Sequence, residues 1–351
     1  MVVFETDTVW EHSIYGYLFL KNLSPLEDYA RAVLFHHRPY YLLTGEDERT
    51  QELASLILLA DRIDILHLSG VSLFPYIERQ RGKLFSPQWV DRFRQAEREE
   101  GLMEALKTGA YRDSLNELFK TADFTPEERR KFLQMVAFSI DFRSEYTVLH
   151  TVTTVSLSVE IGRMLGEPDD ELDSLYYGAL LHDVGKVSTP IAILEKPGRL
   201  TPEEMTVMRR HVEVSDEILA DLVSPCIRRI AVRHHEKLDG SGYPWGLTCD
   251  HLSTDERIVA IADILSALIR KRSYKDAYDK ERVRAILTGM KADGLLCPVL
   301  VDLVLNRYDE LTAAAAQNSR EILGLYTSLR GEYERLLAQV RRREEREALP
   351  L

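Results

Sequence analysis

Apolar residues recur at the three- and four-residue spacing of a helix over most of this sequence, and no series of alternating strands appears. The periodicity predicts helices over residues 26–36 and 50–66, and a closely spaced series from residue 126 onward. The later helices are expected at 126–143, 146–165, 169–184, 201–221, 224–235, 254–270, 280–292 and 297–311, followed by one long charged helix over 317–348. The expected fold class is therefore all-α.

The stretch around Thr125 has the features of a domain boundary. Thr125 suits the N-cap of a helix and Pro126 suits its first position. A chain of 351 residues is long enough for two domains. We predict a helical unit over 1–124, a second domain over 125–316 and a charged C-terminal helix over 317–351. The tail at 341–347 is expected to be a solvated helix end, with a coiled-coil or partner-binding role as the alternative.

The composition excludes several classes of protein. A net charge of −12 argues against a general nucleic-acid or membrane-surface binder. The three cysteines form no Cys-x-x-Cys pair, which fits a reducing cytoplasm. The N-terminus lacks the pattern of a signal peptide, and the longest apolar stretch is far shorter than the roughly 20 residues of a membrane span. We expect a cytoplasmic protein with no DNA partner and no membrane span.

Two adjacent histidines, His234 and His235, end an apolar run and precede a glycine-rich turn. Neighbouring histidines are costly to bury unless something binds them. The turn runs from Asp239 to Gly242 and stops at Pro244, and its glycines let the backbone approach a ligand. This stretch is therefore expected to hold a ligand.

Asp263 lies in a helix that is apolar nearly all round, so that helix must be buried. A carboxylate in such a place is paired, protonated or bound to a metal. An ion pair with an arginine is the ordinary alternative to a metal.

His182 and Asp183 end another apolar helix, and Gly185-Lys186 follows them as a helix stop and a cation. A surface helix end is the alternative reading of this pair. His150 and His211 each stand alone in a helix, where a hydrogen-bonded core histidine is the usual explanation.

The whole set is more informative than its members. Five histidines and two carboxylates on five separate helices offer enough ligands for two divalent metals, with Asp183 bridging them. Nitrogen and oxygen donors without cysteine fit iron, manganese, zinc or cobalt.

The pattern H…HDxGK…H…HH…GYP…D resembles the HD-GYP phosphodiesterases, a branch of the HD metal-dependent phosphohydrolase superfamily. The resemblance covers roughly residues 140–310 and includes the stretches at 193–198, 200–204 and 272–275. It implies an HD-domain helical bundle, a centre of two or three metals (often iron or manganese), and hydrolysis of the bacterial messenger cyclic di-GMP. As partners it implies the cyclic dinucleotide substrate, with a homodimer and a diguanylate cyclase-type protein as further candidates.

Carried over residue by residue, the resemblance assigns a role to each motif position. The metal ligands would be His150, His182, Asp183, His211, His234, His235 and Asp263. Lys186 matches the lysine that contacts the scissile phosphate, and it would act in catalysis with Asp183. Tyr243, Arg272 and Lys275 match the remaining substrate-binding positions.

The sequence departs from the family pattern at two positions. Trinuclear members carry a glutamate where this chain has Tyr146. Glu145 is one residue earlier, so its side chain would face another side of the helix. We therefore predict a dinuclear centre of iron or manganese. Many members carry a second aspartate at the position of Ser266, so the substrate contacts there are put in question.

An internal repeat precedes the motif region. His12 stands 24 residues before His36-His37, much as His211 stands 23 residues before His234-His235. Further matches, in the same order, pair Ser24-Pro25 with Ser224-Pro225, residues 58–61 with 260–263, and 82–87 with 294–298. The first copy lacks the GYP turn and the upstream His-Asp pair. We predict a degenerate, non-catalytic unit with a structural or regulatory role.

These assignments define an expected reaction. Two metals about 3.5–4 Å apart would share Asp183 and a bridging hydroxide, which attacks the phosphodiester in line. Cyclic di-GMP would give linear pGpG, and a second step to GMP is left open. The alternatives are another cyclic dinucleotide such as cyclic GMP-AMP as substrate, a broader nucleotide phosphohydrolase, or a receptor that binds such a nucleotide without hydrolysis.

Overall fold

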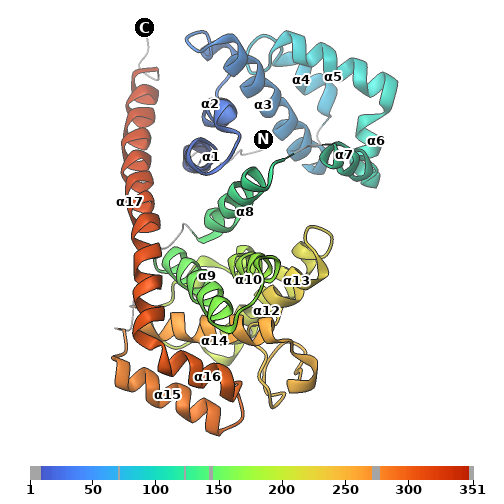
Figure 1. Cartoon of the computed structure of the whole chain (residues 1–351). Coiled ribbons are helices and arrows are strands. Elements are labelled where there is room, and N and C mark those ends of the chain that lie inside the picture. Colours follow the sequence, from blue (N-terminus) through green and yellow to red (C-terminus); the bar gives the residue numbers. More distant parts are fainter. Residues whose placement is uncertain (1–8, 70–71, 122–123, 142–144, 271–276, 348–351) are drawn as a thin grey trace. The chain divides into compact units, whose positions relative to one another are not determined.

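The computed structural model describes residues 9–69, 72–121, 124–141, 145–270 and 277–347. Within them all named elements are helical, which confirms the predicted all-α fold. The α-helices are α1 (Val9–Leu23), α2 (Ala30–Phe35), α3 (Glu48–Ser69), α4 (Leu73–Arg79), α5 (Pro87–Glu100), α6 (Leu102–Thr108), α7 (Tyr111–Lys120), α8 (Pro126–Asp141), α9 (Glu145–Leu165), α10 (Asp169–Leu181), α11 (Ile191–Leu194), α12 (Pro202–Leu219), α13 (Pro225–Val232), α14 (Thr254–Ile269), α15 (Lys280–Ala292), α16 (Pro298–Asn306) and α17 (Tyr308–Glu347). Figure 1 shows their order along the chain.

The helices form two compact units. The first holds the described residues up to Met135 together with those from Leu329 onward, and the second holds Val136–Ser328. Helices α8 and α17 each contribute residues to both units. The boundaries predicted after residues 124 and 316 stay predictions.

The helix ends differ from the predicted ones at the C-terminal side. The helix expected over 297–311 is two helices, α16 and α17, because the backbone leaves the helical conformation at Arg307 (φ −108°, ψ 18°). The long helix therefore begins at Tyr308 rather than at 317. Val304, Tyr308 and Leu311 are all buried, so the apolar periodicity continues across the break and does not reveal it.

Helix α14 is the centre of the second unit, and α9, α10 and α13 contact it. Its first turn is closed by a capping box, in which the Ser253 side chain accepts from Glu256 N–H and the Glu256 side chain accepts from Ser253 N–H. The apolar residues Ile258, Val259, Ile261, Ala262 and Leu265 are at most 1% exposed. The polar residues Asp263 and Ser266 of α14 are therefore surrounded by packed side chains.

Two glycines allow neighbouring segments of the backbone to approach closely near the motif residues. A Cβ at Gly178 of α10 would lie 2.2 Å from Ile230 Cγ2 of α13. A Cβ at Gly185, in the turn Val184–Ser188, would lie 1.9 Å from the His211 carbonyl oxygen of α12. Only glycine brings the turn after Asp183 this close to α12.

The first unit has a smaller core between α3, α4 and α5. Leu58, Leu66, Ile77, Phe85 and Val90 are its best-buried residues. Helix α2 packs against both α1 and α3. The charged stretch over 87–120 is three helices, because Gly101 and Gly109 adopt the left-handed conformation (φ 64° and 77°) between them.

Among the described helices, none combines the length and the apolar character that a membrane crossing demands.

Candidate metal centre

The structure brings all seven predicted ligands together inside the second unit. His150 lies on α9, His182 ends α10 and Asp183 follows it, His211 lies on α12, His234 and His235 follow α13, and Asp263 lies on α14. His182 and His234 are fully buried, and Asp183 is 4% exposed. Residues from five helices therefore converge on one buried polar site.

The histidines divide into two groups. The donor atoms of His150, His182 and Asp183 all lie within 4.8 Å of one another, and so do those of His211, His234 and His235. Each group is compact enough to hold one ion. The sequence contains no signal for this division, which arises from the way the helices pack.

Both carboxylates face both groups. Asp183 Oδ2 lies 3.1 Å from His182 Nε2, while its Oδ1 lies 3.4 Å from His211 Nε2. Asp263 Oδ1 lies 3.0 Å from His150 Nε2, while its Oδ2 lies 3.7 Å from His235 Nδ1. Each carboxylate can therefore contribute one oxygen to each group.

Backbone carbonyls fix the tautomer of three of the histidines. The Nδ1 atoms of His182, His211 and His234 lie 2.7, 2.6 and 2.6 Å from the carbonyl oxygens of Ala179, Met208 and Ala231. A carbonyl can only accept, so Nδ1 carries the hydrogen and a neutral ring turns an Nε2 lone pair inward.

These inward nitrogens are the best test of whether a metal fits. The Nε2 atoms of His182, His211 and His234, and Oδ1 of Asp183, are buried and have no hydrogen-bond partner among the described residues. Buried polar atoms are normally paired. Lone pairs on a histidine whose other nitrogen donates to a carbonyl are the usual donors to a metal ion, so the residues present fit one.

Ser266 has a role that the sequence reading missed. Its hydroxyl donates to the His150 carbonyl oxygen at 3.1 Å, so the Ser266 hydroxyl oxygen accepts a hydrogen bond from His150 Nδ1 at 3.0 Å. This contact turns His150 Nε2 toward Asp263. The three-residue spacing from Asp263 places Ser266 on the same face of α14, and that spacing was the available signal.

The electrostatics of the site shift the pKa values of its groups in different directions. Burial by itself raises the pKa of Asp183, but His182 and Lys186 outweigh it and hold this pKa well below the usual value. Burial lowers the pKa of His235 to about 3. Burial would also lower the pKa of His182, but the neighbouring Asp183 reverses this and raises it to about 9.

The predicted substrate-binding residues are only partly described. The Lys186 ammonium donates to Asp183 Oδ2. The Tyr243 ring lies 4.7 Å from that of His235, and the Arg209 guanidinium lies over the Tyr243 ring at 4.7 Å. Arg209 is a further residue that the sequence reading missed. Arg272 and Lys275 lie outside the described residues.

Glu236 anchors the loop that carries Tyr243. Its buried carboxylate accepts the backbone N–H groups of Trp245 and Leu247, each at 2.9 Å. A Cβ at Gly242 would lie 2.4 Å from Glu236 Cα, so this position requires glycine. The loop is therefore held against the histidine pair by one carboxylate and one close backbone contact.

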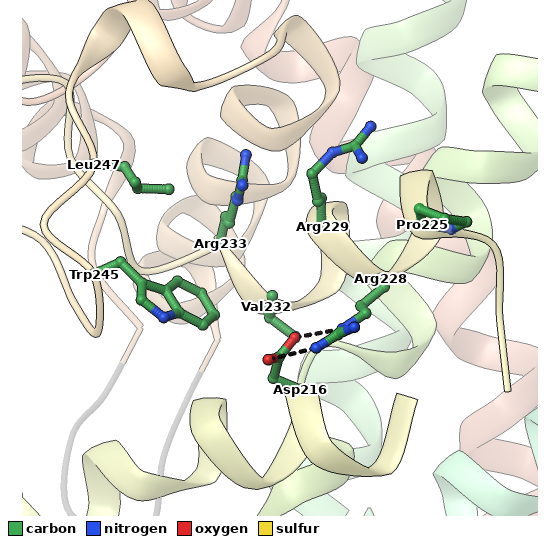
Figure 2. Close-up of a pocket in the computed structure, with 8 residues that line it drawn as sticks. All are labelled: Asp216, Pro225, Arg228, Arg229, Val232, Arg233, Trp245 and Leu247. Carbon is green, nitrogen blue, oxygen red and sulfur yellow. Dashed lines mark hydrogen bonds and ion pairs between the residues drawn. The ribbon is translucent and has the colours of Figure 1, made fainter. Parts of the chain in front are cut away.

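A surface pocket of about 490 Å³ lies outside α13, as Figure 2 shows. Its lining residues are Asp216, Pro225, Arg228, Arg229, Val232, Arg233, Trp245 and Leu247. None of the seven clustered residues lines it. Its arginines face carboxylates, since Arg228 pairs with Asp216 and Arg233 with Glu256.

Comparisons with known proteins find one matching family model and several similar proteins. A family model described as "HD domain" matches residues 124–295. The 3'3'-cGAMP-specific phosphodiesterase 1 of Vibrio cholerae is 29% identical over 88% of this chain, which spans 77% of that relative. The cyclic di-GMP phosphodiesterase response regulator RpfG of Xanthomonas campestris is 35% identical over 55% of the chain, which spans 52% of it.

A solved structure shares the fold. A cyclic GMP-AMP-specific phosphodiesterase of V. cholerae (V-cGAP3) matches 88% of this chain and 72% of its own with a TM-score of 0.56, at 22% identity. The chain thus spans about three quarters of one relative's length and about half of another's. Residues 124–295 of this chain therefore belong to the HD-domain family, and His182-Asp183 and Gly242-Tyr243-Pro244 both lie within them.

Proposed function

We propose that this protein is a metal-dependent phosphodiesterase that hydrolyses a cyclic dinucleotide. One observation carries the proposal: three buried histidine Nε2 atoms and a buried Asp183 oxygen face one another without hydrogen-bond partners among the described residues. The relatives support the substrate class, because their names specify 3'3'-cGAMP and cyclic di-GMP.

Two divalent transition metals, iron or manganese, are proposed for this centre. In support, the histidines form two groups, and Asp183 and Asp263 each turn one oxygen toward each group. Mixed imidazole and carboxylate donors suit these ions. When bound, such metals supply Lewis acidity, which lowers the pKa of water and offsets charge on phosphoryl oxygens.

The protein's own residues position the reaction. Asp183 belongs to the group with His150 and His182 and turns Oδ1 toward His211 of the other group, and its depressed pKa keeps it ionised at neutral pH. The Lys186 ammonium lies beside Asp183, where it offsets the negative charge that develops on the phosphodiester. Tyr243, held by the Glu236-anchored loop beside His235, borders the place where the nucleotide binds.

Cyclic di-GMP, cleaved to pGpG, is the first candidate substrate, and Lys186, Tyr243, Arg272 and Lys275 are its proposed contacts. 3'3'-cGAMP is the second candidate, favoured by one observation. The relative that matches 88% of this chain, and so reaches beyond the HD domain into the first unit, is named as cGAMP-specific.

The test is a comparison of both nucleotides on one preparation. The chain, purified without oxygen and loaded with Mn²⁺ or Fe²⁺, is expected to convert one or both to linear products, separated by chromatography. Asp183→Asn is expected to slow this by on the order of a thousandfold, while Asp216→Asn, outside the centre, retains it. Tight nucleotide binding without product in the metal-loaded protein would establish the receptor alternative instead.

We further propose that the first unit is a degenerate, non-catalytic copy of the second. Three residues after each histidine pair, Tyr40 N–H and Leu238 N–H donate to Leu84 and Leu295 carbonyl oxygens, both at 3.1 Å. Gly82 and Gly294, just before those acceptors, both have positive φ (73° and 72°). A homodimer and a diguanylate cyclase-type partner stay predictions that rest on the resemblance alone.

A further inference from the structure

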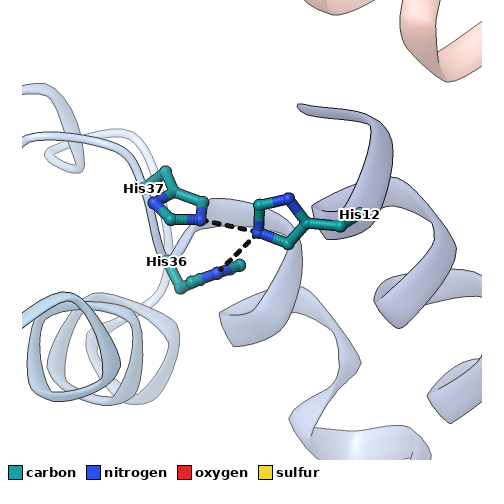
Figure 3. Close-up of side chains that lie close together, drawn as sticks. All are labelled: His12, His36 and His37. Carbon is teal, nitrogen blue, oxygen red and sulfur yellow. Dashed lines mark hydrogen bonds between the residues drawn. The ribbon is translucent and has the colours of Figure 1, made fainter. Parts of the chain in front are cut away.

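Three histidines of the first unit converge on one point, remote in sequence from the centre described above. His12 lies on α1, His36 ends α2, and His37 follows it. His12 Nε2 lies 2.7 Å from His37 Nε2 and 3.3 Å from His36 Nε2. Figure 3 shows the three rings directed at one another. Their donor atoms all lie within 4.8 Å of one another, as in the two groups of the second unit.

Hydrogen bonding among the three rings cannot satisfy all of them. His36 Nδ1 lies 2.5 Å from the Val33 carbonyl oxygen, so it carries the hydrogen, and Nε2 of the neutral ring is a lone pair. His12 Nε2 holds either one hydrogen or one lone pair. If it donates to His37, then the hydrogen on His37 Nδ1, which is buried, has no acceptor among the described residues. If it accepts from His37, its lone pair faces the lone pair of His36.

The geometry matches that of the His211, His234 and His235 group. The rings of His36 and His37 are 3.9 Å apart at 44°, and those of His234 and His235 are 4.0 Å apart at 49°. The His12–His37 and His211–His235 pairs are both nearly perpendicular, at 87° and 88°, with centroids 4.7 and 5.3 Å apart. In both groups the first histidine of the pair turns Nδ1 to the carbonyl three residues earlier.

The surroundings keep His36 and His37 available as ligands. Burial lowers the pKa of His37 to about 3, and burial also lowers the pKa of His36. Neutral imidazoles are the form that binds a metal. Asp61 of α3 supplies nearby negative charge: its Oδ2 is buried and has no hydrogen-bond partner among the described residues, and the Arg62 Nε lies 3.9 Å away.

We propose that His12, His36 and His37 bind one divalent transition metal in the first unit. Three imidazoles without a carboxylate among the close donors favour zinc, nickel or copper over manganese. The described residues place no Asp183–Lys186 equivalent beside these histidines, so the ion holds α1 to the turn after α2 and takes no part in hydrolysis. The proposal does not depend on the activity of the second unit.

Metal stoichiometry of the full chain tests it. Chelator-treated wild type, His12→Gln and His37→Gln are each equilibrated with Zn²⁺ by dialysis, and bound metal is counted per chain. Both variants are expected to bind one Zn²⁺ fewer than wild type. His67→Gln, which changes a histidine of α3 outside the cluster, is the matched control and retains the full count.

The same comparison in an Asp183→Ala background separates the two sites. The loss of one ion on changing His12 is expected there too, whatever happens to hydrolysis. His12 is exposed, so glutamine at that position keeps α1 folded, which circular dichroism checks. Co²⁺ absorption provides a second measurement, since the signal from the first unit disappears in His12→Gln. Equal Zn²⁺ counts and equal Co²⁺ spectra in wild type and both variants would overturn the proposal.

Discussion

The Ser266 hydroxyl donates to the His150 carbonyl oxygen and accepts from the Nδ1 of the same histidine. One side chain therefore fixes both the backbone and the ring of a candidate ligand. Its position on α14, one turn after Asp263, means that a single helix carries a ligand and the residue that orients another.

Ser266→Ala is expected to weaken metal binding at the His150 side of the centre. Without the hydroxyl, His150 Nδ1 loses its acceptor and the ring loses its fixed tautomer, a change that typically costs about 10–100-fold in metal affinity or activity. Mn²⁺ titration of activity measures the shift. Ser158→Ala on α9, where the hydroxyl bonds to the Thr154 carbonyl, is the control. Equal Mn²⁺ dependence in both variants would contradict a role for Ser266.

Lys186→Met is expected to lower kcat by about 10²–10³-fold with metal content retained. The Lys186 ammonium pairs with Asp183, and an ammonium has no lone pair to donate to a metal. In the proposed reaction it offsets charge on the phosphodiester. Metal analysis beside steady-state kinetics separates the two effects. Lys186→Arg keeps the charge and should recover part of the rate. If metal is lost together with activity in Lys186→Met, the residue supports the centre rather than the reaction.

Glu236→Ala is expected to raise KM more than it lowers kcat. Removing the carboxylate leaves the N–H groups of Trp245 and Leu247 without their acceptor, at a cost of about 1 kcal/mol for each of these partly buried groups. The loop with Tyr243 then loses its fixed position, while the metal ligands keep theirs. Glu236→Gln retains an acceptor oxygen and serves as the matched variant. A fall in kcat alone, with KM unchanged, would place the loop in the chemical step.

Local patterns in the sequence predicted most helices of the second unit, and the family resemblance assigned the seven clustered residues as one set. Apolar periodicity predicts α9, α10, α12, α13 and α14 closely, but not the short α11. A carboxylate such as Asp263 in an all-apolar helix must have a partner. The Arg209–Tyr243 contact and the two-group division depend on helix packing, and no local pattern encodes them. The break at Arg307 is hidden because buried positions continue through it.

The pH dependence of stability has a specific source at the start of α14. Burial, with Glu171 and Glu167 nearby, raises the pKa of Asp255 to about 6. The folded protein therefore binds this proton more tightly than the unfolded chain, whose aspartate pKa is about 3.9. The resulting stabilisation is complete below about pH 4 and is lost as the pH rises through about 6.

Asp255→Asn removes the cost of burying an ionised carboxylate at neutral pH, because the amide carries no charge. At pH 7–8 the free energy of unfolding of the variant is expected to exceed that of wild type by about 1 kcal/mol, after allowance for the partly exposed side chain. The variant should therefore unfold at a higher urea concentration. The advantage should vanish near pH 4, where the wild-type carboxyl is protonated. Urea unfolding of metal-free protein across pH 4–8 measures it, with Asp250→Asn at an exposed neighbour as control. A pH-independent difference between Asp255→Asn and wild type would show that the effect is not the titration of Asp255.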